Sequence, residues 1–252
     1  MTAFTSNTND NNSDISSLRY PVICIDGPSG AGKGTVTWRL AQTLGYQLLD
    51  SGALYRIVGL KAFEAGLLNV DGEQSIDEAA LLALTQSLQI VFEPNSDSGR
   101  VDIIVNGAKI GEQVRNETVG GYASRVAVYP KVRQALLKLQ QDMATQSGLV
   151  ADGRDMGTVV FPDADVKVYL TASAKARAER RVAQLLQAGQ AADFEAILAT
   201  IKARDDRDEN RATAPSKPAE DALVLDSSNL DADAVYELVK KHCQDQGICF
   251  NR

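Results

Sequence analysis

Short apolar runs alternate with longer segments of helical periodicity along this chain. The apolar runs are continuous, which is typical of strands buried on both faces of a parallel sheet, and they lie at 20–25, 46–49, 149–151, 166–170 and 222–225. The segments with helical spacing predict helices over about 32–44, 53–66, 130–146, 174–187, 193–211 and 231–246. Strands that alternate with helices in this way predict an α/β fold.

Residues 77–125 interrupt this alternation. A helical patch at 77–88 leads to two strand-like runs, 89–93 and 100–105, which the turn-rich residues 95–99 join as a hairpin. We therefore predict a small inserted α+β subdomain here. The predicted core is formed by the segments on either side, 19–76 and 126–246.

A glycine-rich segment follows the first apolar run and precedes the first helical stretch. Glycines let the backbone wrap closely around an anion, and the N–H groups and dipole at a helix start favour negative charge there. The spacing from Gly27 to Gly32 and Lys33 matches the phosphate-binding P-loop, with Lys33 as the charge for the β- and γ-phosphates. A simple glycine-rich turn with an exposed lysine is the alternative, and the flanking strand and helix disfavour it. The predicted ATP-binding residues are Gly27, Pro28, Ser29, Gly30, Ala31, Gly32, Lys33, Gly34 and Thr35.

The P-loop departs from its usual form at Gly34. A Ser or Thr hydroxyl normally follows the lysine and ligates Mg²⁺, whereas here Thr35 comes one residue later. We therefore expect no direct protein ligand to the metal. The glycines are also wrongly spaced for the dinucleotide-binding pattern G-x-G-x-x-G.

Two further polar segments follow predicted strands, where the carboxyl ends of a doubly wound sheet face a ligand. The first is Asp50-Ser-Gly-Ala-Leu-Tyr-Arg56, with Ser51 and Tyr55 spaced i, i+4 at the start of a helix. This segment is either a helix cap with a solvated arginine or a second anion site that faces the P-loop. Its position one strand away from the P-loop favours the anion site.

The second segment is Asp152-Gly-Arg-Asp-Met-Gly-Thr158. An acid at this strand end is where P-loop enzymes hold metal, and an arginine can bind a phosphate bidentately. A plain Asp-Gly turn is the alternative. Arg154 between Asp152 and Asp155 favours a functional site, with Mg²⁺ held through water near Asp152.

Arginines gather in the last third of the chain. Arg177, Arg180 and Arg181 share one predicted helix, and Arg204 and Arg211 belong to the next, where Arg204, Asp208 and Arg211 would share a face. A surface helix with salt bridges is the default interpretation, and we keep it for Arg180 and Arg207. Phosphoryl transfer needs fixed positive charge around the migrating group, which a lid bearing arginines would supply.

Composition excludes several classes of protein. The net charge of −7 argues against non-specific nucleic-acid binding, which needs a basic face. Three cysteines and one histidine without metal-ligand spacing leave no zinc site and fit a reduced, cytoplasmic compartment. No apolar stretch approaches the ~20 residues that cross a bilayer. Residues 1–18 are polar, lack the pattern of a signal peptide and are predicted to be a disordered tail.

The motifs, taken in order, closely resemble the bacterial cytidylate kinase family of nucleoside monophosphate kinases. The resemblance covers roughly 20–240, and its four motifs are residues 26–35, 50–56, 152–161 and 204–211. It implies a P-loop NTPase fold, a three-layer α/β/α structure with a five-stranded parallel sheet. It also implies that 77–125 is the monophosphate-binding insert and that a short helical lid spans approximately 177–207.

The resemblance also implies roles for individual residues. MgATP would bind the P-loop, and CMP or dCMP would bind the facing crevice. The acceptor site would comprise Asp50, Ser51, Tyr55, Arg56, Ser124, Arg133, Arg154, Asp155, Arg204 and Asp208. Within it, Ser124, Arg133 and Asp155 would read the cytosine edge, while Arg204 and Asp208 would contact the sugar. Catalytic charge would come from Lys33, Asp152, Arg154, Arg177, Arg181 and Arg211.

We therefore expect a monomeric enzyme that transfers the γ-phosphoryl group of ATP to CMP or dCMP. A kinase for another monophosphate or a polyol on the same core is the first alternative. The second is a nucleotide-operated switch, but the sequence contains no Asn-Lys-x-Asp guanine motif. The expected partners are small-molecule nucleotides, with neither nucleic acid nor membrane among them.

Overall fold

The computed structural model describes residues 20–69, 76–95, 100–115 and 117–250. Each of the five predicted core runs forms a strand of one parallel sheet, in the order β2-β6-β1-β7-β8. The strands are β1 (Val22–Asp26), β2 (Gln47–Asp50), β6 (Leu149–Gly153), β7 (Val166–Thr171) and β8 (Leu223–Asp226). The predicted α/β fold with a five-stranded parallel sheet is thus confirmed. The predicted tail at 1–18 lies outside the described residues.

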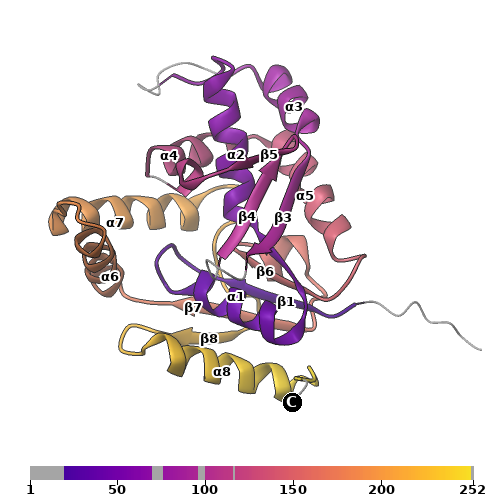
Figure 1. The fold of residues 1–252 in the computed structure, drawn as a ribbon, viewed down its shortest axis with the longest axis vertical. Helices are drawn as coiled ribbons and strands as arrows, with labels where there is room; N and C mark the ends of the chain where they lie inside the picture. The colour runs from indigo at the N-terminus through magenta and orange to yellow at the C-terminus, as the bar shows by residue number, and fades with distance from the viewer. Residues whose placement is uncertain (1–19, 70–75, 96–99, 116, 251–252) are drawn as a thin grey trace, which may run out of the picture.

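Helices cover both faces of this sheet (Figure 1). Successive residues of β1 point to opposite faces, so that Ile23 and Ile25 pack in one hydrophobic cluster and Val22 and Cys24 in another. The first cluster includes residues of α1 (Lys33–Leu44) and α8 (Ala232–Asp245). The second includes residues of α2 (Ser51–Glu64), α4 (Glu117–Val126) and α5 (Pro130–Met143). This arrangement is the predicted three-layer structure.

The segment 77–125 contains the predicted helix and the two paired strands, with additional elements that the sequence pattern did not show; residues 96–99 of the predicted turn lie outside the described residues. Its predicted parts are α3 (Glu78–Ser87), β3 (Ile90–Asn95) and β4 (Arg100–Val105), and β3 and β4 pair antiparallel. Its additional parts are β5 (Ala108–Ile110), a 3-10 turn (Glu112–Arg115) and α4. Buried residues of this segment belong to the same hydrophobic cluster as β6 and α2, so the insert shares a core with one face of the sheet.

Several predicted helix boundaries differ from those in the structure. Helix α2 begins at Ser51 rather than near 53, because the Asp50 carboxylate caps it by accepting from the Ala53 N–H at 2.9 Å. Helix α5 ends at Met143, three residues early. Helix α7 (Phe194–Asn210) ends before Arg211, whose backbone is extended, so Arg211 does not share a helical face with Arg204 and Asp208.

Helices α6 (Ala174–Gln187) and α7 are consecutive along the chain and pack against each other. Both begin at an N-cap side chain, since Ser173 accepts from the Ala176 N–H and Asp193 from the Ala196 N–H. Figure 1 shows the pair projecting to one side, between the level of the sheet and the level of the insert. Among the described residues, no helix is both long enough and apolar enough to cross a membrane.

Candidate active site

The glycine-rich loop joins β1 to α1 at the carboxyl edge of the sheet. Gly27 has φ +136°, and a Cβ there would lie 2.0 Å from the Leu170 carbonyl oxygen of β7, so only glycine allows this close approach. The loop then curls over the Lys33 side chain, whose Nζ donates to the Pro28 carbonyl oxygen at 3.2 Å. The backbone therefore has the geometry of a phosphate-binding loop at a helix N-terminus.

Lys33 faces carboxylates at the ends of two neighbouring strands. Its Nζ lies 3.4 Å from Asp152 Oδ1, and Asp50 is the register partner of Asp152 in the β2–β6 pair. Burial raises the pKa of Asp152 and lowers that of Lys33, and the attraction between the two groups opposes both shifts. The pair thus places one buried cation and one buried acid beside the P-loop.

Asp155 lies between two arginines just beyond the end of β6. It accepts a hydrogen bond from Arg133 of α5, and its Oδ1 is 3.6 Å from the Arg211 guanidinium. Asp155 and Arg133 are both buried, and the Arg133 guanidinium lies 5.5 Å from the centre of the Tyr55 ring. Burial raises the pKa of Tyr55 to about 12, so its phenol stays neutral. A planar ligand with hydrogen-bonding edges suits this group of side chains.

Arg154 is anchored by Asp208 of helix α7. Its Nε donates to Asp208 Oδ2 at 2.9 Å and its NH1 to the Gly153 carbonyl oxygen at 3.3 Å. Burial alone would lower the pKa of Arg154, but the carboxylates of Asp208, Asp152 and Asp26 together raise it, so the guanidinium is always charged. Within the described chain its NH2 group makes no hydrogen bond, which leaves donors for an anion.

Helices α2 and α4 bring together a second set of predicted residues. Arg56 NH1 donates to the Val114 carbonyl oxygen at 3.1 Å, and Ser124 Oγ donates to the Gly120 carbonyl oxygen at 3.2 Å. A Cβ on Gly120 would lie 3.2 Å from Arg56 NH2, so the arginine packs directly on α4. Ser51, at the start of α2, is buried.

Two arginines of the α6–α7 pair hold the P-loop residue Ser29. Arg177 donates to the Ser29 carbonyl oxygen at 3.2 Å, and Arg204 donates to the Ser29 hydroxyl at 3.3 Å. Arg177 is itself fixed by Asp205, whose two carboxylate oxygens accept at 3.0 and 2.5 Å, and by the Ala172 carbonyl oxygen at 2.9 Å. Arg181 lies one turn further along α6 and is partly exposed.

A sequence model described as cytidylate kinase matches residues 23–245, which is most of the chain. The chain belongs to the cytidylate kinase family. The cytidylate kinase of Pasteurella multocida is 53% identical over 214 residues, covering 85% of this chain and 91% of that protein. That of Sodalis glossinidius is 49% identical over 224 residues, covering 89% and 95%. Cytidylate kinase 1 of Haemophilus influenzae is 49% identical over 229 residues, covering 91% and 96%.

The structure brings several of the predicted residues together in two groups of contacting side chains. Lys33 and Asp152 lie at the P-loop, while Arg133, Tyr55 and Asp155 lie together beyond β6. Arg204 is in contact with the P-loop in this structure, although its resemblance-based role is a sugar contact. Arg211 reaches Asp155 although it lies outside the helix.

Arg180 and Asp50 both make contacts that bear on their predicted roles. Among the described residues Arg180 does not form the predicted surface salt bridge; its guanidinium donates to the carbonyl oxygens of Ser227 and Leu230 and so ties α6 to the segment after β8. Asp50 is a helix cap, as one of the two interpretations held. Its binding role stays a prediction.

Sequence reasoning missed two acidic residues that hold parts of the candidate site. Asp205 holds Arg177, and Asp26 accepts hydrogen bonds from the Met156 and Gly157 backbones. Asp26 opens the P-loop motif at the end of an otherwise apolar strand, which is a signal that could have identified it, because an acid there must find donors. Asp205 carries no such signal, since acids and arginines alternate through its whole segment.

Proposed function

We propose that this chain transfers the γ-phosphoryl group of MgATP to CMP or dCMP, giving ADP and CDP or dCDP. The observation that carries the proposal is the buried Asp155 carboxylate, held between Arg133 and Arg211 beside the P-loop region. Cytosine offers an exocyclic amine next to ring acceptors, so a carboxylate and a guanidinium complement its edge. Membership of the cytidylate kinase family supports the same acceptor.

ATP is proposed to bind with its phosphates on the loop from Gly27 to Thr35. Backbone N–H groups at the start of α1 would bind the phosphate oxygens, and Lys33 would neutralise charge that grows on the β–γ bridge. The contacts of Arg177 and Arg204 with Ser29 support a lid role for the α6–α7 pair, because they connect these helices to the loop. Lid closure would exclude water and so suppress ATP hydrolysis.

Magnesium fits this site through oxygen ligands. Asp152 offers a carboxylate beside Lys33, and Gly34 leaves space there, since a Cβ on it would lie 3.8 Å from Asp152 Oδ2. Asp152 would hold the ion through water, in keeping with the reluctance of Mg²⁺ to lose its hydration shell. When bound, the ion neutralises phosphate charge. Among the described residues, no three His, Cys, Asp or Glu side chains gather into a metal site.

The acceptor phosphate is proposed to lie between Arg56 and Arg154. Its oxygen is already anionic near neutral pH, so in-line attack on the γ-phosphorus needs no side-chain base. The protein then contributes orientation and positive charge, with Arg177, Arg181 and Arg211 supplying charge from the lid side. Ser51, Tyr55, Ser124, Arg204 and Asp208 complete the proposed acceptor site.

Substitution of Asp155 by Asn tests this proposal. A carboxylate only accepts hydrogen bonds, whereas an amide both accepts and donates, and uracil presents a carbonyl where cytosine presents its amine. We expect the ratio of kcat/KM for CMP to that for UMP to fall by about tenfold or more, because a hydrogen bond to a charged group is worth about 1.5–3 kcal/mol. An unchanged ratio, with both activities measurable, would show that Asp155 does not read the base.

A kinase for a different monophosphate on the same core is the alternative function. Comparison of ADP release with CMP, dCMP, UMP and AMP in a coupled assay separates the two. We further propose that the protein acts as a cytoplasmic monomer on free nucleotides. The net charge of −7 supports a free nucleotide as the phosphoryl acceptor, because a nucleic-acid substrate would need a basic binding face.

A further inference from the structure

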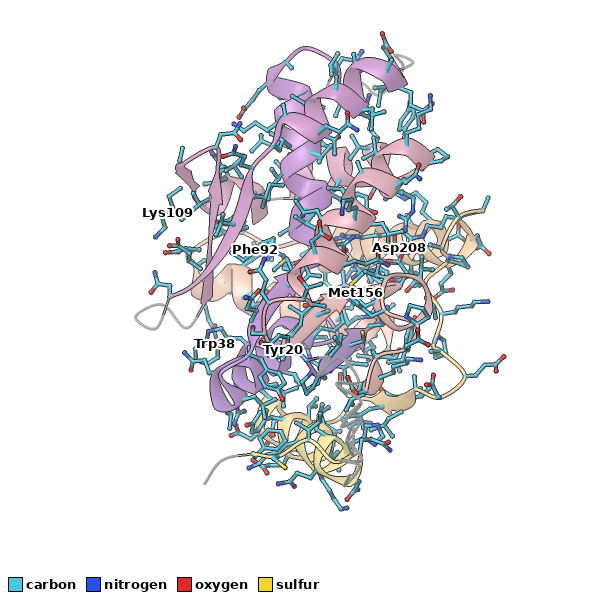
Figure 2. The ribbon with its side chains drawn as sticks, turned by 90° about the vertical axis from the view of Figure 1, so that its right-hand side faces the viewer. Tyr20, Trp38, Phe92, Lys109, Met156 and Asp208 are labelled. Carbon is cyan, nitrogen blue, oxygen red and sulfur yellow. The ribbon has the colours of Figure 1, made fainter. Side chains whose placement is uncertain are left out.

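Asp26 is a buried acid that the proposed chemistry does not use. It is the last residue of β1, directly before Gly27 of the P-loop, and its side chain is only 5% exposed. Its Oδ1 accepts from the Met156 N–H and its Oδ2 from the Gly157 N–H, both at 2.8 Å. Both oxygens of the Asp26 carboxylate therefore accept hydrogen bonds from the backbone of the turn that follows Asp155. Met156 lies near the middle of the molecule (Figure 2).

This turn, Met156–Val160, is a single π-helical turn with Asp155 at its N-cap position. The first N–H groups of a helical segment lack partners within it, and an N-cap Asp ordinarily accepts from them. Asp155 makes no such side-chain bond. Its carboxylate is directed at Arg133 and Arg211 instead, and Asp26 caps the turn from the neighbouring strand.

We propose that Asp26 is a positioning residue for acceptor recognition. By capping the Met156–Val160 turn in place of Asp155, it leaves the Asp155 carboxylate paired with Arg133 and Arg211, in the orientation proposed for reading the acceptor base. Asp26 also adjoins Gly27, so the same residue fixes the base-reading turn relative to the phosphate-binding loop. This inference rests on the proposed role of Asp155.

The surroundings of Asp26 support its use as an ionised acceptor at neutral pH. Burial raises its pKa to about 6, and the two backbone hydrogen bonds oppose that rise. Since this value is below 7, the carboxylate that accepts two N–H groups is the main form in a neutral cell. Charged or titratable groups around it are Lys33, Arg154, Asp155, Lys167, Tyr169 and, on its own strand, Cys24.

Asp26→Asn tests the proposal with little change of shape. The amide keeps one acceptor but turns an N–H₂ group toward a backbone N–H, so the cap is lost at one position. We expect Asp155 to be drawn back to cap its own turn. The ratio of kcat/KM for CMP to that for UMP should then fall by about fivefold or more, with a higher KM for CMP. The KM for ATP should stay within about twofold, because no P-loop contact is removed.

Asp165→Asn is the matched control. Asp165 Oδ2 accepts from the Val22 N–H at 2.8 Å, so it is also an acid bonded to backbone beside β1, but at the end of the strand away from the P-loop. Its variant should keep the wild-type acceptor ratio. Equal ratios for wild type, Asp26→Asn and Asp165→Asn would overturn the inference, provided that Asp155→Asn lowers the ratio. An unchanged ratio in Asp155→Asn would instead overturn the proposed base contact itself.

Should Asp26→Asn fail to fold, the wild-type protein decides the question. The acceptor ratio is measured between about pH 5.5 and about pH 8, where titration of the phosphate is common to CMP and UMP and cancels. We expect the ratio to fall as Asp26 is protonated, with the same midpoint as the pH-dependent shifts of the Met156 and Gly157 amide resonances in NMR. A constant ratio, or a different midpoint, would overturn the inference.

Discussion

Replacement of Arg154 by Ala should weaken the acceptor far more than the donor. The guanidinium is held by two contacts, from Nε to Asp208 and from NH1 to the Gly153 carbonyl oxygen. These contacts orient the side chain at the end of β6, and its NH2 group keeps its donors for a phosphate. The variant therefore removes a charged and pre-oriented contact to CMP.

The usual strength of a charged hydrogen bond sets the size of this effect. A hydrogen bond between charged groups contributes about 1.5–3 kcal/mol, and every 1.4 kcal/mol is tenfold, so the KM for CMP should rise between about tenfold and about 150-fold. Asp208 loses its partner but has a partly exposed side chain, and water can solvate it. The loss of folding stability should therefore be smaller than the loss of acceptor binding.

The assay is ADP release in a coupled reaction, with CMP varied at saturating ATP and then ATP varied at saturating CMP. Arg39→Ala is the matched control, because Arg39 pairs with Asp233 at 2.7 Å on the surface between α1 and α8 and touches none of the proposed site. It should leave both KM values unchanged. An Arg154→Ala variant with equal losses for CMP and ATP would refute the assignment of Arg154 to the acceptor phosphate.

Two further predictions concern the P-loop side of the site. Lys33→Ala should lose most of its kcat, because Lys33 neutralises charge on the β–γ bridge. Its circular dichroism spectrum should stay native. Near-normal turnover in the folded variant would contradict the proposed ATP site. Asp26 should make the free energy of unfolding depend on pH. Its pKa is raised by burial from 3.8 to about 6, so the folded protein binds more protons between these values. The free energy of unfolding of wild type relative to Asp26→Asn should fall by up to about 3 kcal/mol as pH rises from about 4 to about 6. Denaturant titrations across this pH range measure it, and parallel profiles for the two proteins would contradict it.

The core of the fold was predictable because its signals are local. Each apolar run of the parallel sheet lies between helical segments, and the P-loop carries its own spacing. The dipeptide Asn106-Gly107 was an overlooked local signal for strand β5, which follows it. Both residues have positive φ in the structure (51° and 78°). Asn-Gly is the typical dipeptide of a two-residue hairpin turn.

Helix α4 was not predictable from local preference. It contains the adjacent pair Gly120 and Gly121, each of which lowers helix propensity by about 1 kcal/mol. Its packing against α2 overrides this preference, through buried residues such as Val119 and Tyr122. Tertiary contacts of this kind leave no periodic signal in the segment itself.

The contacts within the site were likewise beyond sequence reasoning. Asp155 meets Arg133, which is 22 residues away, and Arg154 meets Asp208, which is 54 residues away. The residue types indicated the chemistry, but only the fold shows which acid faces which arginine. The end of α7 at Asn210 illustrates the limit, because one residue of difference takes Arg211 off the helical face.

A crystal structure of this protein with CMP bound tests the central claim most directly. The account predicts that the cytosine amine lies within hydrogen-bonding distance of the Asp155 carboxylate, with the Arg154 guanidinium on the CMP phosphate. It further predicts that Asp26 still accepts from the Met156 and Gly157 N–H groups. CMP bound with its base away from Asp155, or with its phosphate out of reach of Arg154, would contradict the account.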